Sequence, residues 1–216
     1  MVAEEKVFIS NENLIIEALM HKSASERGVI VCHPHPLMGG SMHNNVVEAV
    51  VRTFAAENFT TLRFNFRGVG ASTGSYEEGK GESCDVVAVC RYLQQSGLSQ
   101  IYFAGYSFGA WVGAMVMEQR EEKFSYSLFI SPPHNYFPFN FNNLKNKLNL
   151  IICGNSDEFC HAENLKKRIK GTRAHLEIIS GANHFYWGKE KEIEDILRKH
   201  LVKYGKIFCE KKVDFK

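Results

Sequence analysis

Short apolar runs rich in β-branched and aromatic residues alternate with segments of helical periodicity along nearly the whole chain of 216 residues. Uninterrupted apolar runs of this kind are typical of strands that are covered on both faces. A helix that connects two such strands lets them pair in parallel and then packs on one face of the sheet. The alternation therefore predicts an α/β protein with a mostly parallel sheet and helices on both of its faces.

The N-terminal segment breaks this pattern. The runs Val7–Ile9 and Leu14–Ile16 are separated by polar residues, which predicts an antiparallel hairpin at one edge of the sheet. We expect one domain over 1–216, with its core at about 28–204 and a polar C-terminal tail over 205–216. The other expected strands are 28–33, 60–66, 100–104, 125–130, 148–153 and 175–179, and the expected helices are 45–57, 82–95, 162–169 and 189–204, with one more helix after residue 107.

One apolar run, Gln100–Ala104, ends in the pentapeptide Gly105-Tyr106-Ser107-Phe108-Gly109 and continues into small residues that suit a helix. Where a strand turns directly into a helix, the residue at the turn is strained, and flanking glycines let the chain turn without steric collision. The pattern therefore predicts that Ser107 lies exposed at the end of a strand. There the amides of a helix N-terminus stabilise a developing anion, which makes Ser107 the candidate nucleophile.

A serine hydroxyl becomes a good nucleophile at neutral pH when a histidine accepts its proton and a carboxylate orients that histidine. In a strand-turn-helix arrangement of this kind, the acid and then the histidine follow the serine along the chain. Asp157 follows the expected strand 148–153, and His184 follows the expected strand 175–179. We therefore predict that Asp157 is the orienting acid and His184 the general base.

Two other carboxylates are alternatives to Asp157 as the acid. Asp85 precedes Ser107 in the chain and sits early in a helical pattern, where a first-turn or capping role is expected. Glu158 adjoins Asp157 and is the weaker alternative of the two residues after that strand.

Hydrolysis by a serine nucleophile also needs hydrogen-bond donors for the oxyanion. The amide that follows the nucleophile is normally one of them, and here it belongs to Phe108. A second amide normally comes from the loop after an earlier strand, which here begins with His33-Pro34-His35-Pro36. Because proline has no N–H group, His35 is the first candidate, with Leu37 or Met38 as alternatives.

Two other chemistries have weaker support. His33, His35 and His43 can be interpreted as metal ligands, but no carboxylate or cysteine set completes a site. The segment Arg67–Gly74 resembles a phosphate-binding turn, but Thr73 stands where the GxGxxG pattern requires glycine. We therefore expect no metal site, and we expect a structural loop at this segment.

These motifs in this order resemble those of the α/β-hydrolase superfamily. Within it, the chain is similar to small bacterial-type serine hydrolases with His-Pro-His-Pro before a double glycine, here His33–Pro36 and Gly39-Gly40, and a later Asn-Phe-Arg-Gly-Val-Gly loop, here Asn65–Gly70. The resemblance covers about 28–204. It implies the α/β-hydrolase fold with a central sheet of about eight strands and no cofactor. It also implies a catalytic triad of Ser107, Asp157 and His184.

Members of this superfamily often carry a large cap after the strand that here ends near Ile130. The segment 131–146 is too short for a helical cap domain, so we expect an open or lightly covered site. Aromatic residues of this segment and of the loop with His184 are candidates for an acyl pocket, although they suit packing on the core equally well. The predicted pocket residues are Leu37, Met38, Tyr106, Tyr136, Phe137 and Phe185.

The predicted function is hydrolysis of a carboxylic ester or thioester of a small molecule through an acyl-enzyme intermediate. One alternative is a peptidase or amidase with the same triad, which needs a group that binds a peptide terminus. No charged cluster near the proposed site supplies such a group. The other alternative is a non-catalytic binding protein of the same fold, which is disfavoured because all three triad candidates are present.

Composition narrows the expected partners and location. The chain has 26 lysine and arginine residues and 24 acidic residues, and a net charge of +2 is too small for the basic field of a nucleic-acid-binding protein. The segment Met1–Lys6 lacks the features of a secretory signal, and no run reaches the length of a membrane span. The six cysteines form no CxxC pair and fit free thiols in a reducing compartment. We therefore expect a cytoplasmic protein, with a homodimer as one option for its assembly.

Overall fold

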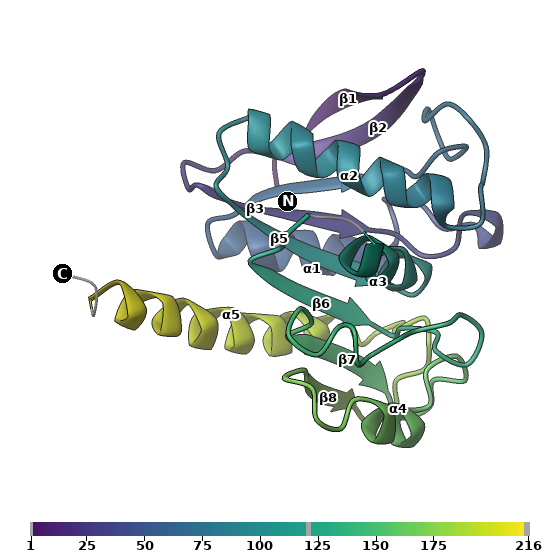
Figure 1. Ribbon diagram of the computed structural model, residues 1–216, viewed down its shortest axis with the longest axis vertical. Coiled ribbons are helices and arrows are strands. Elements are labelled where there is room, and N and C mark those ends of the chain that lie inside the picture. The colour runs from purple at the N-terminus through teal and green to yellow at the C-terminus, as the bar shows by residue number, and fades with distance from the viewer. Residues whose placement is uncertain (1, 120–121, 214–216) are drawn as a thin grey trace.

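The computed structural model describes residues 2–119 and 122–213, with side chains as far as Tyr204. Its sheet consists of β1 (Glu5–Asn11), β2 (Leu14–His21), β3 (Arg27–Cys32), β4 (Thr60–Phe64), β5 (Gln100–Tyr106), β6 (Tyr126–Ile130), β7 (Leu150–Gly154) and β8 (His175–Ile179). The strand order is β1-β2-β4-β3-β5-β6-β7-β8 (Figure 1). β2 is antiparallel to both of its neighbours, and all other pairs are parallel, so the prediction of a mostly parallel sheet is confirmed.

The antiparallel hairpin at the sheet edge is also confirmed, and it is longer than its two apolar runs. Its residues pair from Glu5 with Met20 to Asn11 with Leu14, and Glu12 turns the chain with a φ of 54°. Backbone pairing needs no apolar side chain, so the polar residues beside each run also join the ladder.

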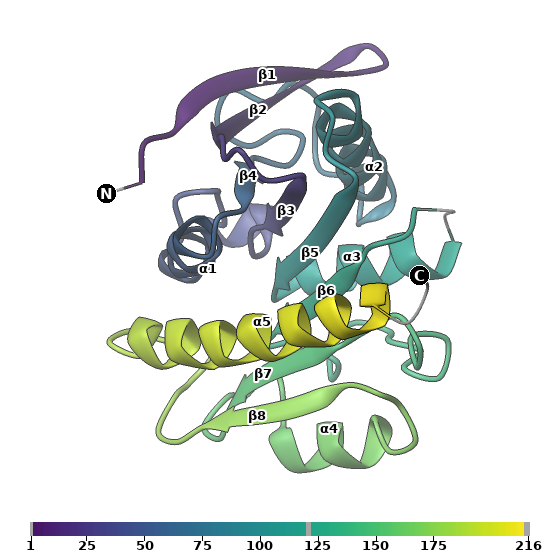
Figure 2. The same ribbon diagram turned by 90° about the vertical axis from the view of Figure 1, so that its left-hand side faces the viewer.

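Helices cover both faces of the sheet, as predicted. α1 (Asn45–Ala56) and α5 (Glu190–Val213) pack on one face, and α2 (Lys80–Gln95), α3 (Phe108–Gln119) and α4 (Ala162–Arg168) pack on the other. Figure 2 shows α1 and α2 on opposite sides of the twisted sheet. This double cover explains why the central strands are apolar at successive positions.

The central strand β5 illustrates this arrangement. Ile101 and Phe103 lie in the core under α2 and α3, and Tyr102 and Ala104 lie in the core under α1 and α5. Successive side chains of a strand point to opposite faces, so burial of both faces requires apolar residues throughout. The strand that leads to Ser107 is therefore held firmly on both sides.

Several element boundaries differ from the sequence prediction by two or more residues, and three of these differences have a clear physical reason. β4 ends at Phe64, because the Phe66 N–H donates to the ring of His33 (3.0 Å) and not to a neighbouring strand. α2 begins at Lys80, where the Glu82 side chain accepts a hydrogen bond from the Gly79 N–H (2.7 Å) and caps the first turn. The third difference concerns the C-terminal end of the chain.

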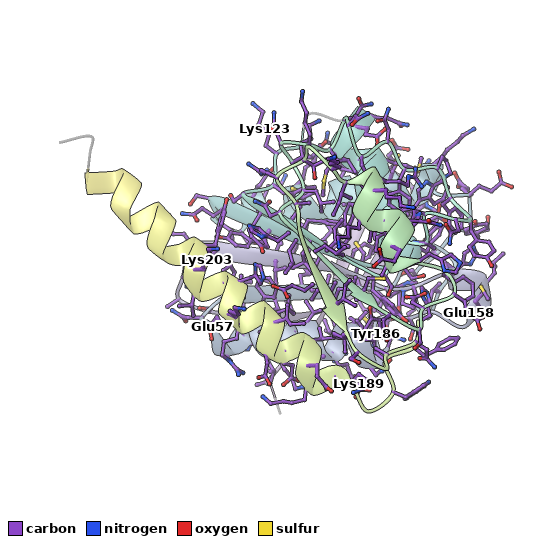
Figure 3. All side chains as sticks on the ribbon, turned by 90° about the horizontal axis from the view of Figure 1, so that it is seen from below. Glu57, Lys123, Glu158, Tyr186, Lys189 and Lys203 are labelled. Atoms are coloured by element: carbon purple, nitrogen blue, oxygen red, sulfur yellow. The ribbon has the colours of Figure 1, made fainter. Side chains whose placement is uncertain are left out.

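The segment expected to form a polar tail over 205–216 is helical as far as Val213, and residues 214–216 lie outside the described part of the chain. No proline follows Tyr204, and the lone Gly205 costs only about 1 kcal/mol in a helix interior, so α5 continues. Figures 1 and 3 show this part of α5 extending past the sheet. Within residues 2–119 and 122–213, no helix combines the length and apolar character needed to cross a membrane.

The connection between β6 and β7 carries no cap. The whole segment 131–149 is described, and it consists of turns and irregular structure without a helix. The expectation of a fold without a large cap domain is therefore confirmed.

Candidate active site

Four polar side chains follow four neighbouring parallel strands. Ser107 follows β5, Ser131 follows β6, Asp157 comes after β7, and His184 comes after β8. The Ser107 N–H donates to Ile130 O (2.9 Å), and the Ser131 N–H donates to Ile152 O (2.8 Å). The hydrogen bonding between neighbouring strands therefore continues into the site. The carboxyl ends of parallel strands meet at one edge of a sheet, which is where this fold class binds ligands.

The turn around Ser107 has the strain that the sequence predicts, but the two glycines act differently from the expectation. Ser107 adopts a φ of 53°, whereas Gly105 and Gly109 do not have a positive φ. A Cβ atom on Gly105 would lie 2.6 Å from the carbonyl oxygen of Gly109. A Cβ atom on Gly109 would lie 2.7 Å from Cys32. These glycines are therefore required by the close approach of the helix to the strands, and not by their own dihedral angles.

The side chains of Ser107, His184 and Asp157 form one chain of hydrogen bonds. His184 Nε2 lies 2.8 Å from Ser107 Oγ, and His184 Nδ1 lies 3.0 Å from each carboxylate oxygen of Asp157. An ionised carboxylate only accepts hydrogen bonds, so Nδ1 carries the proton of the neutral ring and Nε2 is free to accept the proton of the serine hydroxyl. All three residues are less than one-tenth exposed, so the prediction that Ser107 lies exposed is wrong, although Ser107 does line a cavity. The geometry thus suits proton transfer from Ser107 to His184.

Three further hydrogen-bond donors fix the Asp157 carboxyl group. Its Oδ1 accepts from the amides of Phe159 (2.8 Å) and Cys160 (2.9 Å), and its Oδ2 accepts from the hydroxyl of Ser131. Burial, the largest influence, raises the pKa of this carboxyl group, but the hydrogen bonds and the charge of His184 outweigh it and hold the pKa below its ordinary value. Asp157 is therefore ionised at neutral pH.

The loop that carries His184 is tied to the strand that carries Ser107. The Tyr106 hydroxyl donates to the carbonyl oxygen of His184 (2.6 Å), and burial raises the pKa of Tyr106 so that it keeps this proton. Gly154, at the end of β7, packs directly against the backbone of Ala182, where a side chain would not fit. The imidazole is therefore held between β5 and β7.

Two amide groups at this site remain open to a ligand. Of the alternatives in the loop after β3, the Leu37 N–H donates to His35 Nδ1 (3.2 Å) and the Met38 N–H to His35 O (3.0 Å). Neither the His35 N–H nor the Phe108 N–H donates a hydrogen bond to any described residue. Both residues line the same cavity as Ser107, and their rings lie 4.8 Å apart.

The histidines that follow β3 have partners within the protein. His33 is buried, its Nδ1 lies 2.6 Å from Pro34 O, and its Nε2 accepts from the amide of Phe66. Burial lowers the pKa of His33 to about 4, so the ring is neutral. His35 Nε2 lies 3.3 Å from the Tyr76 hydroxyl. Among the described residues, no three histidine, cysteine or acidic side chains converge as a metal site.

A cavity of about 570 Å³ opens at Ser107. Most of the predicted pocket residues line it, but Leu37 does not and is 71% exposed. Phe159 also lines the cavity, although it is not among the predicted residues, and its ring centroid lies 4.5 Å from that of His184. The lining consists of Pro34, His35, Met38, Gly39, Gly40, Asn44, Tyr106, Ser107, Phe108, Pro133, Tyr136, Phe137, Phe159, His184, Phe185 and Trp187.

The aromatic residues of the 131–146 segment both line the cavity and pack on the fold. Phe137 lines the cavity and also stacks on the ring of Trp111 on α3, with the ring centroids 4.4 Å apart. Tyr136 is 65% exposed at the cavity mouth, 5.1 Å from Phe159. The sequence pattern alone does not separate these roles, because both need an aromatic side chain at the same place.

The alternative acids lie elsewhere. Asp85 is fully buried and accepts hydrogen bonds from the Arg67 amide and guanidinium and from Asn11 Nδ2. Glu158 is exposed, and Figure 3 shows it at the periphery of the molecule. Of the three candidate acids, Asp157 is the one whose carboxylate lies within hydrogen-bond distance of His184.

The loop 67–74 binds the N-terminal hairpin through its own amides. The Ala71 N–H donates to Glu17 Oε2 (2.8 Å), and the Thr73 N–H donates to Ile15 O (2.9 Å). The Gly68 N–H donates within the loop, to the carbonyl of Thr73. These amides are therefore not available to a phosphate group, and the structural interpretation of this loop agrees with its contacts.

A family model described as alpha/beta hydrolase fold matches residues 29–150 of the chain. The chain belongs to the alpha/beta hydrolase fold family. The match includes Ser107 and the loop after β3, whereas Asp157 and His184 lie beyond it. The family that the motifs resemble is therefore confirmed by an independent comparison.

Individual members of the alpha/beta hydrolase fold family are similar over most of the chain. An uncharacterised protein from Rickettsia prowazekii is 34% identical in an alignment of 201 residues that covers 87% of this chain and 84% of that protein. A structure described as an alpha-beta serine hydrolase homologue from Coxiella burnetii is 32% identical, with a TM-score of 0.83, over 91% of this chain and 97% of that chain. A putative alpha/beta hydrolase of unknown function from Agrobacterium tumefaciens is 30% identical, with a TM-score of 0.83, over 92% of this chain and 95% of that chain. Family membership and these neighbours support a hydrolase.

Proposed function

We propose that the chain is a serine hydrolase that cleaves a carboxylic ester or thioester through an acyl-enzyme intermediate. The observation that carries this proposal is the hydrogen-bond chain from Ser107 Oγ through His184 to the buried carboxylate of Asp157. A nucleophile within hydrogen-bond reach of a base, which a third group orients, is the arrangement that nucleophilic acyl transfer requires. We assign these three residues as the catalytic triad.

In the acylation half-reaction, Ser107 Oγ attacks the carbonyl carbon and its proton passes to His184 Nε2. The carbonyl oxygen becomes an oxyanion, which the N–H groups of Phe108 and His35 stabilise. The two N–H groups have no partner among the described residues, which supports this assignment. Asp157 stabilises the imidazolium without taking its proton. The intermediate then collapses, and His184 protonates the departing alcohol or thiol.

In the deacylation half-reaction, a water molecule gives a proton to His184 Nε2 as its oxygen attacks the acyl-enzyme. The second tetrahedral intermediate expels Ser107 Oγ, which regains the proton from His184. The products are a carboxylic acid and the free enzyme, so the atoms balance with water as the only co-reactant. No metal or cofactor takes part in this scheme.

The cavity favours a neutral acyl group. Its lining contains aromatic, apolar and small residues together with the histidines, and none of its lining residues is lysine, arginine, aspartate or glutamate. A peptidase that recognises a free peptide terminus needs a charged partner for that terminus, and this lining offers none. We therefore favour an ester or thioester substrate over a peptide.

A fluorophosphonate probe tests this proposal. We expect it to label the wild-type protein at Ser107, located by mass spectrometry, and we expect the Ser107→Ala variant to remain unlabelled. A panel of neutral acyl esters, acyl thioesters and aminoacyl amides then assigns the substrate class. Labelling that persists in the Ser107→Ala variant, or folded wild-type protein that neither labels nor hydrolyses any of the panel, would overturn the proposal.

A further inference from the structure

We propose that Ser131 and Tyr186 are positioning residues that hold the Asp157 carboxylate in its catalytic orientation through a relay of two hydroxyl groups. This inference rests on the proposed function, because it concerns the acid of the same triad. Neither residue lines the cavity at Ser107, so both act through Asp157 and not on the substrate.

Ser131 lies between the two strands that carry the nucleophile and the acid. It follows directly after β6, its backbone is at a φ of 46°, and its side chain is fully buried. Its hydroxyl donates to Asp157 Oδ2. The other carboxylate oxygen, Oδ1, accepts from two backbone amides, so Ser131 supplies the only side-chain donor other than His184 that the described residues offer to this carboxylate.

Tyr186 completes the relay. Its hydroxyl lies 2.7 Å from Ser131 Oγ, and the residue is fully buried with a φ of 55°. Because the Ser131 hydroxyl has one proton and gives it to Asp157, the Tyr186 hydroxyl must donate to Ser131 Oγ. Burial raises the pKa of Tyr186 well above its ordinary value, so this donor stays protonated. Figure 3 shows Tyr186 close to the start of α5.

The relay links three loops that must keep a fixed geometry. Ser131 belongs to the loop after β6, Asp157 to the loop after β7, and Tyr186 stands two positions after His184 in the loop after β8. A donor on Oδ2 prevents the carboxyl group from rotating, while the amides hold Oδ1. It also contributes to the lowered pKa of Asp157. Both consequences keep an ionised, correctly oriented carboxylate facing His184 Nδ1.

Backbone strain at both residues points to the same role. A residue with a side chain in the left-handed region is strained and persists there only when the surrounding structure holds it. Here two such residues direct their hydroxyl groups toward each other and toward Asp157. Glycine at either position would relieve the backbone but would lose the hydroxyl.

Strand β6 also provides matched controls. Tyr126 and Ser127 are buried in the same strand, and their hydroxyl groups have no hydrogen-bond partner among the described residues. Removing those hydroxyl groups deletes the same atoms from a similar environment without touching the relay. These controls therefore measure the effect of deleting a buried hydroxyl group where no hydrogen bond is lost.

The titratable groups around Asp157 define what a pH profile measures. They are His184, Tyr106, Tyr186, Cys153 and Cys160. Burial raises the pKa values of Tyr106, Tyr186 and Cys160, so these groups stay neutral in the acidic range. Loss of the Ser131 hydroxyl removes an influence that lowers the pKa of Asp157. A carboxylate with one donor fewer accepts more strongly from His184 Nδ1 and so favours the charged imidazolium, and the acidic limb of activity moves toward higher pH.

The test compares Ser131→Gly and Tyr186→Phe with the controls Ser127→Ala and Tyr126→Phe. Steady-state hydrolysis of a neutral acyl ester is measured across the acidic and neutral range, together with the thermal midpoint of each variant. We expect Ser131→Gly to lower kcat about tenfold with little change in KM, and to move the acidic limb to higher pH. We expect a smaller loss of about threefold for Tyr186→Phe, because Ser131 still donates to Asp157. Both controls should stay within about twofold of the wild type.

The double variant separates a relay from two independent contacts. If Tyr186 acts through Ser131, the combined Ser131→Gly and Tyr186→Phe variant loses no more activity than Ser131→Gly alone. Ser131→Ala serves as a second removal of the hydroxyl in case the glycine variant folds poorly. An unchanged pH profile in folded Ser131 variants, or losses equal to those of the controls, would refute the relay. If the wild type itself does not hydrolyse or label, the proposed function fails and this inference falls with it.

Discussion

Two buried aspartates at the same end of the sheet show how a partner decides the role of a carboxylate. Asp85 is completely buried and faces Arg67, which binds it through the guanidinium and the backbone amide. Asp157 is almost as deeply buried but faces His184. Arginine keeps its proton under all relevant conditions, whereas histidine exchanges one near neutral pH. Burial of a carboxylate therefore does not by itself indicate a reactive site, and it is the titratable partner that makes Asp157 the candidate acid.

The surroundings of the two aspartates also differ: those of Asp85 are structural contacts, whereas those of Asp157 lead to the cavity. Near Asp85, further hydrogen bonds join the loop 67–74 to the hairpin, including the one from the Ala71 N–H to Glu17 Oε2 (2.8 Å). Around Asp157, the contacts lead to a hydroxyl group that faces an open cavity. We therefore expect substitutions on the Asp85 side to change stability and substitutions on the Asp157 side to change activity.

The sharpest test of this difference is Asp157→Asn. The amide cannot hold the imidazole in the tautomer that accepts the serine proton, so kcat is expected to fall about ten-thousandfold. The thermal midpoint should change far less than the activity. A variant that retains more than a tenth of the wild-type kcat would contradict the proposed difference between Asp157 and Asp85, since Asp157 would then have no special role.

The reciprocal variant is Asp85→Asn. It leaves the Arg67 guanidinium, whose side chain is 7% exposed, with only the half-exposed Glu77 as a charged partner. Breaking a buried pair in this way is expected to lower the free energy of unfolding by about 3 kcal/mol. Chemical denaturation gives the stability, and active-site titration normalises kcat to folded enzyme. A large loss of kcat in the folded fraction would contradict a structural role.

A third test uses His33, whose ring is hydrogen-bonded to Pro34 in the loop after β3 and to Phe66 after β4. Its pKa is lowered from 6.5 to about 4, so the folded state binds fewer protons than the unfolded state between these values. Stability from this residue is therefore complete above about pH 6.5 and is lost by about 3 kcal/mol as the pH falls to about 4. Denaturation of the wild type and of His33→Gln at several pH values checks this expectation. The variant should be less stable at neutral pH but should show a flatter decline with acid.

The smallest expected effect is at the cavity mouth. Tyr136 is 65% exposed and touches the cavity only at its rim, near Phe159. Tyr136→Ala is expected to raise KM for apolar esters by about threefold and to leave kcat unchanged, since lost apolar contact affects ground and transition states alike. A decrease in kcat without a change in KM would place Tyr136 in the chemical step.

The sequence predicts those parts of the fold and site that depend on local order along the chain. The alternation of apolar runs predicts the sheet, and the order of Ser107, Asp157 and His184 after successive strands predicts which side chains meet. Neither conclusion needs knowledge of loop geometry. The fold is confirmed, and the structure brings the three side chains within hydrogen-bond distance of one another, although their catalytic role stays a prediction.

Features that depend on the convergence of several loops do not follow from the sequence. Ser131 looks like the start of an irregular connection, and its position directly after an apolar run was the one available signal. Phe159 enters the cavity only because the loop after β7 folds back over the imidazole. The need for glycine at position 109 also depends on the folded structure, since a side chain there would collide with Cys32 of β3.

The position of β8 in the sheet has a dynamic consequence. β8 is an edge strand that pairs with β7, and His184 lies in the loop that follows β8. Edge elements open locally at a lower free energy than central strands such as β5. We expect amide hydrogen exchange to be faster in 175–179 than in 100–106, and each such opening would withdraw the imidazole from Ser107 while the rest of the sheet stays intact. On heating, activity would then be lost through local opening of β8 at a lower temperature than that at which the whole protein unfolds.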